Sequence, residues 1–158
     1  MTKEELLENF DFIDNNFYWK KPRSGIKVGQ KAGSVEKKGY LRIKFNCKKY
    51  LVHRLVFLYH YGYMPQFVDH INNIKNDNRI ENLREATFAQ NRFNTKKQKN
   101  NTSGIKNVHW SKKHNRWLVT MSVDKKLKYF GCYKDIELAG LVAMELRNKY
   151  HKEFAQHF

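Results

Sequence analysis

The segment 95–103, TKKQKNNTS, is the feature that most constrains how this chain can fold. It is polar and positively charged, and it contains no aliphatic or aromatic side chain that could join a hydrophobic core. We therefore expect two small domains, at 1–95 and 104–158, joined by a basic linker at 96–103. A chain of 158 residues is long enough for this organisation.

The charge of the chain indicates which partner it binds. The formal net charge is +16, with 31 Lys and Arg residues against 15 Asp and Glu residues. Such a chain attracts polyanions, so nucleic acid is the expected partner. No stretch approaches the roughly 20 apolar residues of a membrane span, and no basic N-terminus precedes an apolar segment. We expect a cytoplasmic protein that binds no membrane, with Cys47 and Cys132 as buried, reduced thiols.

The first domain mixes helical and strand patterns. Leu6, Leu7 and Phe10 have roughly helical spacing, which predicts a short helix over 4–12. Glycine turns and β-branched or aromatic residues over 17–54 predict two or three short antiparallel strands. In the clearest strand, at 41–45, apolar residues alternate with Arg42 and Lys44, so these two cations should face solvent. A buried helix over 55–62 should then end at Gly62.

The segment 67–94 predicts the order strand, loop, strand, helix. The expected strands are 67–70 and 79–84, the polar loop is 72–78, and the helix is 87–94. Within this segment, Asp69 and His70 are followed by Asn82 and Asn91. A carboxylate, an imidazole and two carboxamides at these intervals are the side chains that a one-metal phosphodiesterase needs.

The chemistry of phosphodiester hydrolysis explains why these residue types matter. The reaction needs a water, a base that takes its proton, and positive charge near the developing anion. An imidazole can be the base, and Mg²⁺ prefers a few oxygen ligands while keeping several waters. Adjacent strand residues point to opposite faces, so Asp69 and His70 can act on one phosphate only if another element, such as the helix carrying Asn91, wraps the motif.

The segments VHRLVFLYHYG (52–62), VDHINNIKNDNRIENLR (68–84) and TFAQNRFN (87–94) resemble the HNH endonucleases of the ββα-metal fold, in particular the homing enzymes of phages and introns. The resemblance implies that His70 is the general base and that Asp69 and Asn91 bind one divalent metal ion. Mg²⁺ is the expected ion, with Mn²⁺ as the alternative, and no small-molecule cofactor is expected. Asn82 would fasten the loop and help to orient the base. Two roles are open for His53 and Arg54. Either residue could contact this site or its phosphate, or it could have a structural role at the start of a helix.

The second domain predicts a sheet packed on a helix. The expected strands are 108–110, 117–123 and 128–133, and the expected helix is 136–150. Residues 96–131 hold ten cations against Asp124 alone, which gives +9 over this stretch and predicts DNA binding that depends steeply on salt. A cationic face that only keeps the protein in solution is the simpler alternative.

The segment 103–151 resembles the Apetala-type DNA-binding domain, in which a three-stranded sheet enters the major groove. That resemblance implies a set of groove-facing or phosphate-binding side chains, with Trp110 either stacking on the DNA backbone or packing on the helix. The DNA-binding candidates of the whole chain are Arg42, Lys44, Arg54, Lys106, His109, Trp110, Lys112, Lys113, Arg116, Thr120, Ser122 and Lys128.

The sequence thus predicts an α+β protein with antiparallel sheets and the function of a metal-dependent endonuclease acting on double-stranded DNA. We expect a monomer rather than a dimer. The alternative is a DNA-binding transcription regulator without catalysis, and a third class is an RNA-binding or ribosome-associated protein. Intact Asp69, His70, Asn82 and Asn91 favour the enzyme, because the other two classes have no use for this set of residues.

Overall fold

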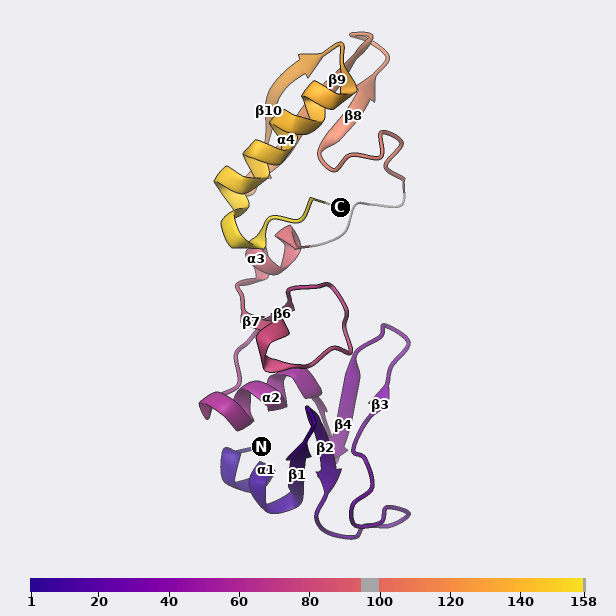
Figure 1. The fold of residues 1–158 in the computed structure, drawn as a ribbon, viewed down its shortest axis with the longest axis vertical. Coiled ribbons are helices and arrows are strands. Elements are labelled where there is room, and N and C mark those ends of the chain that lie inside the picture. The colour runs from indigo at the N-terminus through magenta and orange to yellow at the C-terminus, as the bar shows by residue number, and fades with distance from the viewer. Residues whose placement is uncertain (95–99, 158) are drawn as a thin grey trace. The chain divides into compact units, whose positions relative to one another are not determined.

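The protein divides into two compact units, Met1–Phe88 and Ala89–Phe158. The structure is a computed structural model that describes residues 1–94 and 100–157 (Figure 1). The first half of the expected linker, 96–99, lies outside the described residues. The division falls seven residues before the expected end of the first domain, so α3 (Phe88–Phe93) is counted almost entirely with the second unit. The predicted α+β class with antiparallel sheets is confirmed.

The first unit begins with a short helix and a hairpin. Helix α1 (Lys3–Asn9) has a capping box in which Thr2 and Glu5 bond each other's backbone N–H groups. Strands β1 (Phe10–Ile13) and β2 (Asn16–Trp19) form an antiparallel pair. The predicted helix over 4–12 was therefore too long. The turn residues Asp14 and Asn15 adopt positive φ angles of 48° and 60°, which close a tight hairpin and draw Phe10 into a strand.

A second sheet has the order β3 (Ser34–Val35), β4 (Leu41–Phe45), β5 (Lys48–Leu51). Ile43 and Phe45 on β4 are buried while Lys44 is exposed, as the alternation predicts. Cys47 lies in the β4–β5 turn with a φ of 61° and is exposed, so its predicted burial was wrong.

Helix α2 (Val52–Tyr61) packs on these strands and completes the core of the first unit. Its C-cap residue, Gly62, has a φ of 80° and donates its N–H to the Leu58 carbonyl, so the predicted stop at this glycine is confirmed. Strand β6 (Val68–His70) pairs with β7 (Leu83–Glu85), and the turn η1 (Ile80–Asn82) precedes β7. The predicted strand over 79–84 is therefore a single 3₁₀ turn followed by a shorter strand.

The second unit is a three-stranded sheet with one long helix. Strands β8 (Val108–Ser111), β9 (Arg116–Val123) and β10 (Lys126–Tyr133) are antiparallel in the order β10, β9, β8. Helix α4 (Ile136–His151) lies along one face of this sheet (Figure 1), and the turn η2 (Lys152–Phe154) follows it. The core consists of Val108, Val119, Ala139 and Ala143.

A bulge bends the last strand of this sheet. The β9–β10 register shifts between Tyr129 and Cys132, and Gly131 adopts a φ of 124° there. A Cβ at Gly131 would lie 2.8 Å from the Tyr133 hydroxyl, so only glycine fits. Cys132 is exposed beside this bulge, which makes its predicted burial wrong as well. No helix in the described part of the chain is long and apolar enough to cross a membrane.

Candidate active site

The candidate active site lies on the β6–β7 pair of the first unit. Asp69 is opposite Arg84 and His70 is opposite Leu83. All three residues of β6 are buried, and Asp69 and His70 are only 4% and 5% exposed. Side chains with ionisable groups are almost never buried to this extent unless they have partners, so the contacts of these two residues define what the site can do.

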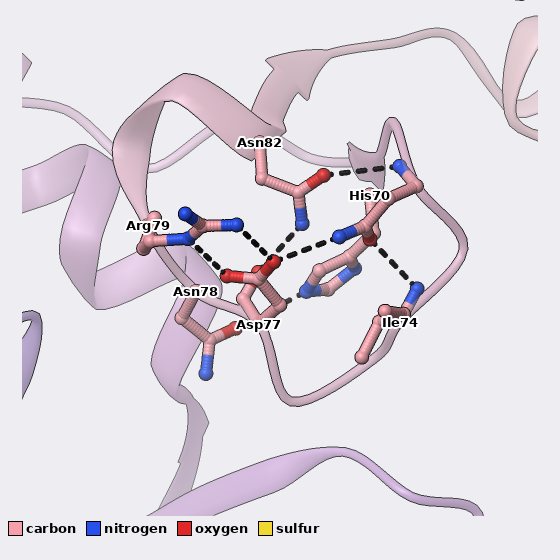
Figure 2. Close-up of polar contacts among 7 residues, drawn as sticks. His70, Ile74, Asp77, Asn78, Arg79 and Asn82 are labelled. Carbon is pink, nitrogen blue, oxygen red and sulfur yellow. Dashed lines mark hydrogen bonds and ion pairs between the residues drawn. The ribbon is translucent and has the colours of Figure 1, made fainter.

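Asn82 fastens the loop that joins the two strands. Its Oδ1 accepts the Asn72 N–H at 3.0 Å, and its Nδ2 donates to the Asp77 carbonyl at 2.7 Å. Asn72 in turn donates its amide to the Asp77 carboxylate at 2.7 Å (Figure 2). Arg79 donates two hydrogen bonds of 2.9 Å to the same carboxylate and, as the largest cause, holds the pKa of Asp77 well below its usual range. The loop is therefore held by its own side chains.

The imidazole of His70 is oriented by Asn78, a residue for which the sequence had predicted no role. His70 Nε2 lies 3.1 Å from Asn78 Oδ1, and Asn78 is 5% exposed. A carboxamide oxygen can only accept, so Nε2 carries the proton and Nδ1 bears the lone pair of the neutral ring. Asn82, which we expected to fasten the loop and to help to orient the base, bonds the loop backbone with both side-chain polar atoms. The loop holds several asparagines, and nothing in their spacing distinguishes Asn78.

Burial sets the protonation state of His70. Desolvation lowers its pKa, and this outweighs the raising influence of the Asn78 hydrogen bond and of the Asp69 and Asp77 carboxylates. The ring is therefore neutral at neutral pH, which is the state in which a base can accept a proton.

Two further rings pack against His70. The His53 ring stands nearly perpendicular to it, at 89° with centroids 5.0 Å apart, and Tyr40 contacts both imidazoles. His53 is 4% exposed, and its Nδ1 has no hydrogen-bond partner in the described part of the chain. Burial, followed by the charges of His70, Arg54 and Arg42, lowers the pKa of His53 to about 3. The two residues considered from the sequence thus differ. The His53 ring contacts the ring of the proposed base, whereas Arg54 donates to the Pro65 carbonyl at 2.9 Å.

Asp69 is paired with a cation. Arg84 Nε and Nη2 both lie 2.8 Å from Asp69 Oδ2, so the guanidinium pairs with the buried carboxylate. A buried carboxylate together with amide oxygens is a ligand type that suits Mg²⁺ or Mn²⁺. Within residues 1–94 and 100–157, no group of three or more His, Cys, Asp and Glu side chains could hold a metal ion by itself. Asn91, the other predicted ligand, is half-buried on α3 in the second unit.

The DNA-binding candidates of the first unit differ in their surroundings. Arg42 forms an ion pair with Glu36, with Nε and Oε2 3.1 Å apart. Lys44 is exposed on β4, as expected. Arg54 donates a hydrogen bond to the Pro65 carbonyl. Lys44 therefore has the surroundings that best suit a phosphate contact among these three.

In the second unit, strand register decides which predicted DNA contacts share a face. Directly opposite residues of an antiparallel pair point to the same side of a sheet. Lys128 is opposite the buried Met121, and Trp110 is opposite Trp117, which packs on the helix-side core. Lys128 and Trp110 therefore lie on the side that α4 covers, and not on the uncovered face. Trp110 makes a T-shaped contact with Trp117, with centroids 4.9 Å apart, and remains 40% exposed, so stacking on the DNA backbone stays a prediction.

The remaining candidates of this unit fall into two groups. Lys106 donates from Nζ to the Phe93 carbonyl at 2.9 Å, and burial followed by the charge of Arg147 lowers its pKa to about 8, so this lysine is turned into the unit. Register places the others on the uncovered face of the sheet or in the exposed β8–β9 turn. These residues are His109, Lys112, Lys113, Arg116, Thr120 and Ser122.

Residues 50–93 match the family model described as HNH endonuclease. The matched stretch includes Asp69, His70, Asn82 and Asn91, and it supports an HNH-type nuclease domain at this position. Protein 3.8 of Escherichia phage T7 is 27% identical over 139 residues, which cover 88% of this chain and 93% of the phage protein. No solved structure matches the chain. The Apetala-type resemblance of the second unit stays a prediction.

Proposed function

We propose that the protein is a metal-dependent DNA endonuclease of the homing type in which His70 is the general base. The observation that carries this proposal is the His70–Asn78 contact at 3.1 Å, next to a buried carboxylate. Asn78 leaves Nδ1 of the neutral ring as the nitrogen that can take a proton, and the lowered pKa keeps the ring neutral.

In the proposed reaction, His70 Nδ1 takes a proton from a water whose oxygen forms a bond to the scissile phosphorus. The P–O3′ bond breaks, and the leaving oxygen receives a proton from solvent, which gives 5′-phosphate and 3′-hydroxyl ends. Asp69, and Asn91 on the strength of the motif alone, would hold one divalent ion, Mg²⁺ or Mn²⁺. When bound, such an ion supplies positive charge that stabilises the phosphorane and the leaving oxygen. Arg84 keeps the Asp69 carboxylate in one orientation.

The second unit would hold the DNA. Its uncovered sheet face carries Arg116, Thr120 and Ser122, and the exposed turn before β9 adds Lys112 and Lys113. Only three of these five side chains are cations, so we expect fewer phosphate contacts than the overall charge suggests. Double-stranded DNA is the proposed substrate. We expect only a few polar side chains of this unit to contact base edges.

Plasmid cleavage tests this function. The wild-type protein should nick or cut supercoiled DNA with Mg²⁺ or Mn²⁺, and EDTA should abolish the reaction. His70→Ala should lower the cleavage rate by about 10²- to 10⁴-fold, because it removes the base, while gel-shift affinity stays unchanged. His60→Ala is the control, since His60 is an exposed histidine of the same unit. Undiminished cleavage by His70→Ala would contradict the assigned role. Binding without cleavage by the wild type would indicate a DNA-binding regulator instead.

A further inference from the structure

The loop between β6 and β7 buries two asparagine side chains and exposes two isoleucines. Asn78 and Asn82 are 5% and 8% exposed, whereas Ile71 and Ile74 are 46% and 52% exposed. Single exposed apolar residues are common on protein surfaces. Here two of them lie three positions apart in one loop, which at the same time buries the polar side chains of Asn78 and Asn82.

The loop cannot easily turn these isoleucines inward. The Ile71 N–H donates to the Asn82 carbonyl at 2.9 Å, and the Ile74 N–H donates to Asn72 Oδ1 at 2.8 Å. The Ile74 carbonyl also accepts the Asp77 N–H at 3.0 Å. Figure 2 shows the hydrogen bond that the Ile74 N–H donates. Moving either side chain into the core would break hydrogen bonds that pin the backbone on both sides. The loop therefore presents both isoleucines in a fixed position.

The isoleucines also lie close to the proposed base. Ile71 directly follows His70, and consecutive Cα atoms are about 3.8 Å apart. The Asn73 N–H donates to the His70 carbonyl at 2.9 Å, so 70–73 is a tight turn that keeps Ile74 near as well. Both isoleucines therefore lie within four positions of the proposed base, on the loop that directly follows it.

Lysines lie on the same loop and on the turn that contacts it. Lys75 donates from Nζ to the Lys38 carbonyl at 3.0 Å and lies over the Tyr40 ring at 4.9 Å. This contact ties the β3–β4 turn to the loop and brings the exposed Lys37 and Lys38 next to it. Exposed isoleucines and lysines on neighbouring segments match a polyanion that also has apolar surfaces, and stacked DNA bases next to a phosphate have both properties.

We propose that Ile71 and Ile74 insert against a base step next to the scissile phosphate and unstack it. Apolar side chains that enter a step in this way kink the duplex, and pyrimidine–purine steps resist this least. The proposal rests on the proposed function, because it takes duplex DNA as the substrate and His70 as the group that approaches it. It adds a preference for deformable steps that no base-edge contact would produce.

Permanganate oxidation, which reacts with unstacked thymines, tests this proposal without requiring cleavage. The double variant Ile71→Ala/Ile74→Ala is compared with its parent, both carrying His70→Ala, on the same duplex with Mg²⁺. The parent should make thymines at pyrimidine–purine steps reactive, and the double variant should lower this reactivity at least about fivefold. Ile13→Ala is the matched control, because Ile13 is a 55% exposed isoleucine of the same unit, and its reactivity should equal that of the parent. Thermal unfolding checks that each variant is folded.

The proposal would be overturned by the absence of protein-dependent thymine reactivity, or by equal reactivity with and without the isoleucines. Unstacking that occurs only on RNA would overturn it as well. A second readout uses cleavage by proteins that keep His70. The double variant should cut intact duplex about tenfold more slowly, and a mismatch at the cleaved step should restore the rate, since that step is already unstacked. Failure of the proposed function is distinct, because it would leave isoleucine-dependent unstacking without any cleavage.

Discussion

The two units of this protein both bury polar side chains, but they use them differently. In the first unit, Asn78 and Asn82 bond around His70 and its loop. In the second unit, the 2% exposed Arg147 donates to the Lys106 carbonyl at 2.6 Å and so fastens a helix to the segment before β8. His151 stacks on Phe93, with ring planes 5° apart. In the proposed mechanism, only the buried polar groups of the first unit have a reactive atom to orient, the Nδ1 atom of His70.

This contrast predicts that Asn78 affects catalysis more than stability. Asn78→Ala removes the acceptor that fixes the His70 tautomer, and we expect the single-turnover cleavage rate to fall by about 10- to 100-fold, as for other partners of active-site groups. Asn76→Ala is the control, because Asn76 is an exposed asparagine of the same loop. An equal rate for both variants would show that Asn78 has no part in orienting the base.

The same contrast concerns His53, whose buried imidazole should reduce the stability of the first unit in acid. Its folded pKa of about 3 lies below the ordinary 6.5, so the unfolded chain binds the additional proton below pH 6.5. The stability of the first unit should therefore fall as the pH drops from 6.5 towards 3. His53→Phe keeps a ring and removes this titrating group. The change that it causes in the free energy of unfolding should therefore be about 2 kcal/mol more favourable at pH 5 than at pH 7.5.

Urea unfolding at the two pH values measures this difference. His60→Phe, at an exposed position, should show no such pH dependence. If His53→Phe changes stability equally at both pH values, the buried imidazole is not the origin of the acid sensitivity.

The smallest predicted effects concern the two faces of the second sheet. Arg116→Ala, on the uncovered face, should reduce the slope of log affinity against log salt by about 1, as expected for one lost phosphate contact. Lys128→Ala, on the side that α4 covers, should leave the slope unchanged. Fluorescence anisotropy of a labelled duplex over a salt series measures both. The reverse ranking would show that the helix-covered side faces the DNA.

Much of the fold could be predicted because local patterns determine it. The strand, loop, strand, helix order of 67–94 and the helix stop at Gly62 follow from turn residues and periodicity. The end of α1 could not be predicted in this way. Phe10 fits a helical face as well as a strand, and the hairpin that Asp14 and Asn15 close decides between them.

The faces of β10 were harder still. Lysines alternate there with Leu127 and Tyr129, and alternation normally turns lysines to solvent and the apolar residues to the core. The two-residue turn at Asp124 and Lys125 instead fixes Lys126 opposite Val123. Register therefore puts Leu127 and Tyr129 on the uncovered face, at 74% and 59% exposed.

The candidate site shows the same limit. Its sequence spacing predicted His70 and Asp69, because their chemistry is distinctive. The partners of these residues come from positions that only the folded loop and strand register bring together: Asn78 for the imidazole and Arg84 for the carboxylate. His53 reaches His70 from helix α2, seventeen positions earlier in the chain, and no local pattern indicates that contact.

The tautomer of His70 tests the central claim most directly. Long-range ¹H–¹⁵N correlation spectra of the intact protein distinguish a protonated Nε2 from a protonated Nδ1. We predict a neutral ring at pH 7 with the proton on Nε2 and the lone pair on Nδ1, and a pKa below 6.5 in a pH titration, because burial is its largest influence. A ring protonated on Nδ1, or charged at pH 7, would contradict the assignment of His70 as a base held ready by Asn78.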